Sequence, residues 1–181
     1  MKRMNRHEIL GDLASKWEET GKRHLYLVMG SCTELAAFER DLKTNAKTPE
    51  RQPLRPPISV NSALLARLPD EELNKLDGGE AKYPTMVHDR LKKEFEALLL
   101  GALDKQNIVI LKDMELLFAF NLDLALLRLH ATNGRHVVLL LPGQRVGDRI
   151  ILFHEAEDRF ERKLPANLIM ENHIWEIGHD G

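Results

Sequence analysis

Hydrophobic residues in this chain follow two spacings that alternate along the sequence: helical spacing and short uninterrupted runs. Apolar side chains repeat every three or four positions in several segments, which is typical of helices with one buried face. These helical segments are 5–20, 33–44, 85–104 and 114–132, the last with a break near Asn121. Uninterrupted apolar runs predict strands that are covered on both faces. These runs are 24–29, 108–111, 136–141 and 149–153, with a shorter one at 58–60.

The alternation of buried strands with helices predicts an α/β fold in which helices flank a mostly parallel sheet. We expect a single domain over 1–181, with an N-terminal helix inside 1–22 that Asn5 caps. Two polar segments interrupt the pattern. The segment 45–57 is rich in proline, and 70–84 contains a Gly-Gly pair, so both are predicted to be loops.

Composition agrees with a folded globular protein and removes several classes of function. Hydrophobic residues make up 43% of the chain and charged residues 30%, while the net charge of −2 gives no overall attraction to nucleic acid. Cys32 is the only cysteine, so an intrachain disulfide is impossible. No apolar stretch reaches the roughly 18 residues of a membrane helix, and no signal peptide is apparent. We therefore expect a cytoplasmic protein that does not associate with membranes.

The stretch from His24 to Phe38 has the strand, turn and helix order of a phosphate-binding P-loop. Gly30, Ser31, Cys32 and Thr33 form the turn and are the candidate anion-binding residues, with Thr33 as the expected helix cap. A working P-loop has the pattern G-x-x-x-x-G-K-[ST]. Counted from Gly30, its last three positions fall on Leu35, Ala36 and Ala37. The same stretch also fits an ordinary strand-to-helix turn.

Two later strands lack the other groups that an ATPase needs. In P-loop ATPases an apolar strand ends in an aspartate that helps to hold magnesium. Here the strand 108–111 is followed by Lys112, and Asp113 comes one position late. The strand 136–141 is expected to close at Pro142-Gly143 and offers no polar residue at its end. This pattern favours either an unrelated α/β fold or a pseudo-ATPase, which keeps the fold without the catalysis.

Three segments of the sequence are "ISVNSALLARL", "IVILKDMELLFAFNLDLALLRL" and "HVVLLLPG". Together they resemble the small P-loop protein of BREX phage-defence systems, the BrxF type. In that family the second strand leads into a helix with an N-x-x-L pattern, and the Walker B segment is similar to L-D-N-I-E-L-L-F. Lys112 stands where the family has aspartate and Asp113 where it has asparagine, while Glu115 is retained. The segment "LPGQRVGDRIILF" also resembles BrxB, another small BREX protein. The resemblance covers roughly 24–154.

This resemblance implies a P-loop-NTPase-like fold and a role in bacterial anti-phage defence. Because the Walker residues are replaced, we expect a non-catalytic adaptor that binds a larger protein of the same defence system, with no cofactor. A divergent nucleotide-binding ATPase remains an alternative. The eight histidines are scattered through the sequence and none is paired at ligand spacing, so no metal site is expected.

A second alternative is an accessory subunit that contacts DNA. The proline-rich segment carries a positive stretch in which Lys47, Arg51 and Arg55 are the candidate phosphate contacts. No aromatic residue is interleaved to stack on a base, and the segment equally fits a solvated loop. Any binding of DNA is therefore expected to be weak.

The segment that follows Lys112 is the predicted partner-binding element. It is apolar on nearly every side, whereas a helix that covers a sheet usually keeps one polar face. Phe118, Phe120 and Leu124 are the candidate contacts with the larger protein. Alternatively, the N-terminal helix covers this segment through Leu13 and Trp17.

Overall fold

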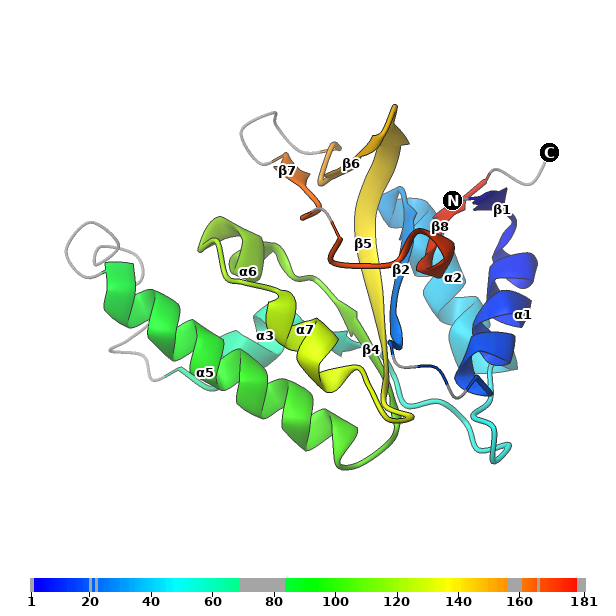
Figure 1. Cartoon of the computed structure of the whole chain (residues 1–181), viewed down its shortest axis with the longest axis horizontal. Helices are drawn as coiled ribbons and strands as arrows, with labels where there is room; N and C mark the ends of the chain where they lie inside the picture. Colours follow the sequence, from blue (N-terminus) through cyan, green and yellow to red (C-terminus); the bar gives the residue numbers. More distant parts are fainter. Residues whose placement is uncertain are drawn as a thin grey trace.

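Three layers make up the protein, with a mixed β-sheet between two layers of helices (Figure 1). The computed structural model describes residues 2–19, 21, 23–68, 84–155, 161–165 and 167–178. Within these residues the sheet has eight strands, of which six form the path β1-β8-β2-β5-β4-β3. Every neighbouring pair along this path is parallel. The predicted α/β class and the mostly parallel sheet are therefore confirmed.

The strands are short except for β5, which spans both parts of the sheet. The strand bounds are β1 Lys2–Met4, β2 Leu25–Gly30, β3 Ile58–Ser59, β4 Ile108–Lys112, β5 His136–Val146, β6 Arg149–Leu152, β7 Arg162–Lys163 and β8 Ile174–Ile177. The first half of β5 pairs with β2 and β4 in parallel, and its second half pairs with β6 in the antiparallel sense. β7 then pairs with β6.

Helices cover both faces of this sheet. Their bounds are α1 Arg6–Trp17, α2 Cys32–Asn45, α3 Val60–Leu65, α5 Pro84–Leu103, α6 Glu115–Ala119 and α7 Ala125–His130, with a short 3₁₀ helix, η2, at Glu171–His173. α1 and α2 pack on one face, where Phe38 and Tyr26 are fully buried. α3, α5, α6 and α7 pack on the other, around Phe95 and Leu111. Because helices cover both faces of the sheet, its central strands are apolar without interruption.

Side-chain caps fix where the first two helices begin. Asn5 accepts a hydrogen bond from the Glu8 amide, and the Glu8 carboxylate accepts one from the Asn5 amide, so the predicted cap is confirmed. The prediction of Thr33 as the second cap is wrong. Ser31 takes that role in the same reciprocal arrangement with Glu34, and α2 begins at Cys32.

The segment after Lys112 forms two short helices rather than one long helix. α6 and α7 are separated at Asn121, which has a φ of 50°, so the expected break is confirmed. The N-terminal helix does not cover this segment, because Leu13 and Trp17 belong to the apolar core of the opposite face. α5 shares the core with α6 and α7 instead.

β5 does not close at Pro142-Gly143 as its sequence predicted. The strand continues to Val146, and β6 approaches it so closely that a Cβ at residue 143 would lie 2.9 Å from the Ile151 carbonyl oxygen. Glycine is therefore needed there for steric reasons. β1, β7 and β8 were not predicted. The predicted loop at 70–84 lies almost entirely outside the described residues.

None of the helices in the described part of the chain has the length and apolar character needed to cross a membrane.

Candidate functional site

A cleft of about 610 Å³ opens at the carboxyl ends of the parallel strands, beside the N-terminus of α2. Ligands of open α/β sheets usually bind at this edge. The described residues that line the cleft are Cys32, Asn61, Glu115, Leu116, Phe118, Ala119, Pro142, Phe153, Glu155 and Arg162. They come from α2, α3, α6, β5, β7 and the segment after β6, so segments far apart in sequence form one site.

The turn Gly30 to Thr33 lies where the sequence placed a degenerate phosphate loop, between the end of β2 and the first turn of α2. Two of its backbone amides already bind carboxylates of the same chain. The Ser31 amide donates to Glu34 Oε2 at 2.7 Å, and the Cys32 amide donates to Glu155 Oε2 at 3.1 Å. Helix N-termini attract anions, and here two glutamates supply the anionic groups.

The Cys32 side chain lies in a negative environment. Burial raises the pKa of its thiol, and the carboxylates of Glu155 and Glu115 raise it further. The pKa of Glu155 is lowered, first by the hydrogen bond from the Cys32 amide. A thiolate nucleophile needs the opposite environment, with cations or free amides around the sulfur. The site therefore does not activate Cys32.

Lys112 follows the apolar part of β4, where an ATPase has its magnesium-binding aspartate, and it pairs with a carboxylate on α2. Lys112 Nζ lies 2.8 Å from Glu39 Oε2, and Lys43 Nζ lies 2.9 Å from Glu39 Oε1. Burial alone would raise the pKa of Glu39, but the hydrogen bonds from the two lysines outweigh it and lower that pKa. The hydrogen bond to Glu39 raises the pKa of Lys112. The strand thus supplies a cation and the helix an anion, the reverse of what a P-loop needs for magnesium and phosphate.

Asn61 and Glu115, which belong to two different segments of the resemblance, meet at the edge of the cleft. Asn61 Nδ2 donates to Glu115 Oε2 at 2.6 Å, and the Leu116 amide donates to Asn61 Oδ1 at 3.1 Å. The backbone amide of Asn61 in turn donates to the Asp113 backbone carbonyl at 2.9 Å. These three bonds fix the start of α3 to the start of α6 and hold the Glu115 carboxylate in place.

The three predicted partner contacts do not form one exposed surface. Phe118 is 8% exposed and lines the cleft, Leu124 is 3% exposed and belongs to the core, and Phe120 is half-buried against that core. Phe118 thus lines the cleft, Phe120 is partly accessible beside the core, and Leu124 is inaccessible without rearrangement of the core.

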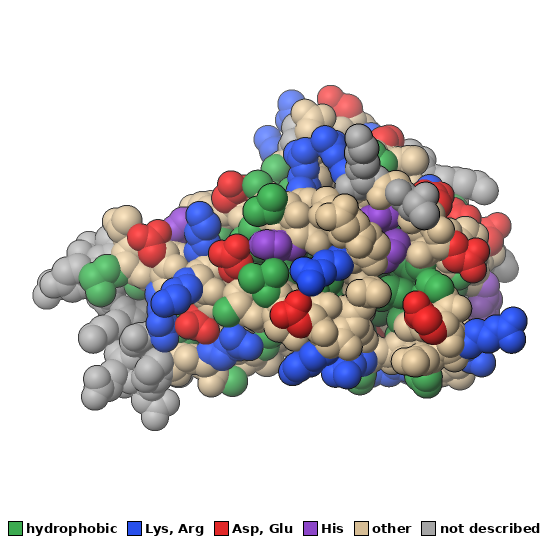
Figure 2. Space-filling view, turned by 60° about the horizontal axis from the view of Figure 1, so that its bottom comes forward, with side chains coloured by type: hydrophobic (Ala, Val, Ile, Leu, Met, Phe, Trp, Pro, Cys, Tyr) green, Lys and Arg blue, Asp and Glu red, His purple; other side chains and the backbone are tan. Residues whose placement is uncertain are grey.

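Lys47, Arg51 and Arg55, the predicted DNA contacts, are all exposed in the loop between α2 and β3. Lys47 forms an isolated bridge with Pro53, and Arg51 has a φ of 61° in the turn between them. On the face drawn in Figure 2, Lys and Arg side chains lie interspersed with Asp and Glu rather than in a continuous basic surface.

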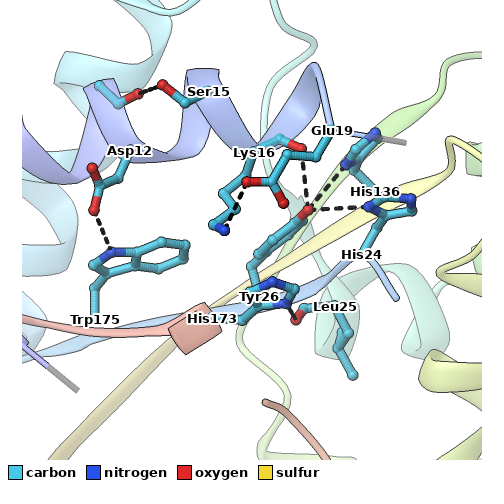
Figure 3. A network of polar contacts seen from close by, with 11 residues as sticks. Asp12, Ser15, Lys16, Glu19, His24, Leu25, Tyr26, His136, His173 and Trp175 are labelled. Atoms are coloured by element: carbon cyan, nitrogen blue, oxygen red, sulfur yellow. Dashed lines mark hydrogen bonds and ion pairs between the residues drawn. The ribbon is translucent and has the colours of Figure 1, made fainter. Parts of the chain in front are cut away.

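Three histidines, which the sequence showed as scattered, meet around one tyrosine at the opposite edge of the sheet (Figure 3). The Tyr26 hydroxyl lies 3.2 Å from His24 Nδ1 and 3.3 Å from His136 Nδ1. The ring of His173 packs 4.7 Å from that of Tyr26, between ring centroids. All four side chains are at most 3% exposed. Among the described residues, no three His, Cys, Asp or Glu side chains are arranged so that together they could hold a metal ion.

Burial determines how this histidine–tyrosine cluster titrates. Burial, with a smaller contribution from the nearby His24, lowers the pKa of His136 to about 4. Burial also lowers the pKa of His24 and of His173, against the opposing effect of the Glu19 carboxylate, while Lys16 adds to the lowering at His173. Burial raises the pKa of Tyr26. The cluster is therefore neutral at pH 7.

A sequence signal for this cluster exists, although spacing along the chain does not reveal it. His24 directly precedes β2, His136 begins β5, and His173 directly precedes β8. β5, β2 and β8 are parallel neighbours, so residues at their amino ends meet at one edge. A histidine at the start of each of the apolar runs 24–29 and 136–141 therefore predicts the contact of His24 with His136. His173 has no such signal, because β8 carries Glu176 and is not an uninterrupted apolar run.

Comparison with known proteins identifies no relative: no family model, curated protein or solved structure matches this chain.

Proposed function

We propose that this protein is a pseudo-ATPase: a P-loop-NTPase-like domain that does not turn over nucleotide and acts as an adaptor in a BREX-type anti-phage system. In this role it binds a larger protein of the same system. The segments that resemble the BrxF type carry the assignment to BREX, and the geometry of the cleft carries the loss of catalysis.

The order of the strands supports the P-loop-like part of this proposal. β2, the strand that leads into the degenerate phosphate loop, is separated from β4, the strand of the Walker B segment, by β5. β8 lies on the other side of β2, and β3 lies at the edge beyond β4. β2 and β4 therefore end at the same carboxyl edge of the parallel sheet, where the ligands of open α/β sheets bind. Similarity of fold alone does not assign an activity, so the site has to decide.

The single observation that carries the non-catalytic role is the occupation of the phosphate-loop amides by the chain's own carboxylates. Glu34 and Glu155 bind the Ser31 and Cys32 amides, so a phosphate group would have to displace two anions. The Lys112–Glu39 ion pair places a cation where magnesium needs a ligand. Both features oppose the binding of magnesium and ATP.

The asparagine and glutamate of the resembling segments support the assignment to the family. Asn61 and Glu115 are 54 positions apart, yet they share a hydrogen bond at the edge of the cleft. The family pattern therefore coincides with a structural unit that connects α3 to α6. The two alternatives, an active ATPase and a DNA-binding subunit, have no comparable structural support.

Co-expression tests the adaptor role. The tagged chain is produced together with the larger proteins encoded beside it, and the complex is isolated with and without ATP and magnesium. We expect one larger protein to co-purify in a fixed ratio, independently of nucleotide. A gene neighbourhood with a large ATPase, a methyltransferase and an alkaline-phosphatase-like protein would identify the system.

ATP hydrolysis by the purified chain would contradict the proposal. The control variant is Lys112→Ala, which removes the cation from the end of β4 but leaves the core strand intact. A rate of hydrolysis above background, altered by this variant, would show that the site is catalytic.

A further inference from the structure

We propose that the cleft at the carboxyl ends of the strands is a docking site for a basic segment of the partner protein that carries a bulky apolar side chain. This inference rests on the proposed adaptor function and specifies the chemistry of the partner. The partner segment would occupy the place that a nucleotide takes in an active P-loop ATPase.

The floor of the cleft is apolar and well ordered by packing. Phe118 and Phe153 meet edge to face with ring centroids 5.2 Å apart, and both are largely buried. Leu116, Ala119 and Pro142 complete the apolar lining. A volume of about 610 Å³ lies within the range of about 300–1,000 Å³ that is typical of ligand pockets. Such a floor favours an aromatic or large aliphatic side chain over a sugar or a phosphate.

The charged side chains at the rim of the cleft determine which charge a bound partner segment should carry. Two of the described lining residues are carboxylates, Glu115 and Glu155, and one is a cation, Arg162, which donates to the Glu161 carbonyl. Burial raises the pKa of the Cys32 thiol most, and the two carboxylates raise it further because they lie close to the sulfur in the cleft. Complementarity therefore favours lysine or arginine beside the apolar anchor and disfavours acidic peptides and nucleotides.

Both carboxylates are held in position before any partner binds. Asn61 holds Glu115 through a 2.6 Å hydrogen bond, and the Cys32 amide holds Glu155 through a 3.1 Å bond. A carboxylate has about four acceptor positions, so each glutamate can accept further hydrogen bonds from a cationic side chain. Because these side chains are already ordered, binding costs less conformational entropy.

The sole cysteine allows a direct test, because Cys32 lines the cleft and is exposed to solvent. The probes are two synthetic peptides, acetyl-Lys-Trp-Lys-amide and acetyl-Glu-Trp-Glu-amide. The rate at which iodoacetamide alkylates Cys32 is followed by intact mass, with and without each peptide. At a peptide concentration of about 10 mM, suited to a millimolar affinity, we expect the basic peptide to slow alkylation about threefold or more. The acidic peptide should have no effect.

A pair of double variants tests the role of the charges. Glu115→Gln with Glu155→Gln keeps an acceptor oxygen for Asn61 and for the Cys32 amide but removes both charges. The affinity for the basic peptide should fall about three- to tenfold, so that a threefold protection falls below about twofold. The control, Glu18→Gln with Glu50→Gln, changes two exposed carboxylates outside this cleft and should keep full protection. Each variant is compared with itself without peptide, since the substitutions also change the reactivity of Cys32.

Three results would overturn the docking site: no protection by the basic peptide, equal protection by both peptides, or protection that survives the loss of both glutamates. Co-purification separates this failure from a failure of the adaptor role. If the larger protein binds the Glu115/Glu155 variant as well as it binds the wild type, the docking site is wrong and the adaptor role stands. If no larger protein binds any variant, the adaptor role fails, and the peptide result alone decides the chemistry of the cleft.

Discussion

Acidification from pH 7.5 to pH 5 should destabilise this protein through the buried histidine–tyrosine cluster. His136 is 3% exposed and packs against Tyr26 and the ring of His24. Its pKa is about 4 in the folded protein, compared with 6.5 for an ordinary histidine. Between these two values the unfolded chain binds a proton that the folded protein excludes, so stability is complete above pH 6.5 and falls as the pH approaches 4.

The size of the effect follows from the same two pKa values. For a single site with these values, the free energy of unfolding at pH 5 is lower by about 2 kcal/mol than at pH 7.5. The lowered pKa values of His24 and His173 act in the same direction. Carboxylates with lowered pKa values, such as Glu39, lose their contribution at a lower pH, below the ordinary value of 4.5. Between pH 7.5 and pH 5, the change in the free energy of unfolding therefore comes mainly from the histidines.

Urea denaturation at both pH values measures the loss. The variant His136→Asn should be less stable at pH 7.5, because the ring contacts and the contact with the Tyr26 hydroxyl are lost, but its stability should depend less on pH. His7→Asn, at an exposed position, is the control and should behave as the wild type does. Equal stability of the wild type at the two pH values, or an unchanged pH dependence in His136→Asn, would refute the reasoning.

Three substitutions test the packing described above. Phe95→Ala removes a fully buried ring from the core beneath α5 and should lower the free energy of unfolding by about 3–5 kcal/mol in urea denaturation. A loss below about 1 kcal/mol would contradict the place of Phe95 in that core. Gly143→Ala brings a Cβ against the Ile151 carbonyl oxygen and should lower the free energy of unfolding by about 1–3 kcal/mol. Gly147→Ala is the comparison: no atom lies near its Cβ, but its φ is 64°, so its loss of stability measures backbone strain alone. Phe118→Asp should strongly lower the thermal midpoint, while Leu129→Asp, at a side chain that is 69% exposed, should leave it nearly unchanged; equal midpoints would mean that Phe118 is not packed as described.

The sequence predicted those elements whose apolar residues form uninterrupted runs or helical repeats. β2, β4 and the first half of β5 are buried on both faces, so their residues are apolar except for Lys112 and His136 at the strand ends, and the run is easy to recognise. β8 is equally central, but its four residues include Glu176, which a buried strand rarely carries. Arg3 on β1 neutralises Glu176 at 2.8 Å, and this partner lies 173 positions away. A strand that depends on such a pair cannot be recognised from local pattern.

The candidate site was predicted in part, for a similar reason. The strand-turn-helix order of 24–38 and the lysine at position 112 are local features, and they located the turn beside the cleft and the cation at the end of β4. The carboxylate of Glu155 reaches the Cys32 amide across 123 positions, which no local motif records. The apolar character of the segment after Lys112 suggested an interface, but α5 and the sheet bury most of it within the chain itself.

Isothermal titration calorimetry with ATP and magnesium tests the central claim most directly, namely that the phosphate-loop amides are closed by Glu34 and Glu155. We predict no magnesium-dependent binding by the wild type at physiological nucleotide concentrations. The double variant Glu34→Ala with Glu155→Ala frees both amides and should bind inorganic phosphate more tightly than the wild type does. A micromolar dissociation constant for ATP in the wild type, abolished by Gly30→Val, would contradict the account, since a Cβ at residue 30 would lie 3.0 Å from Glu34 Oε2 in that loop.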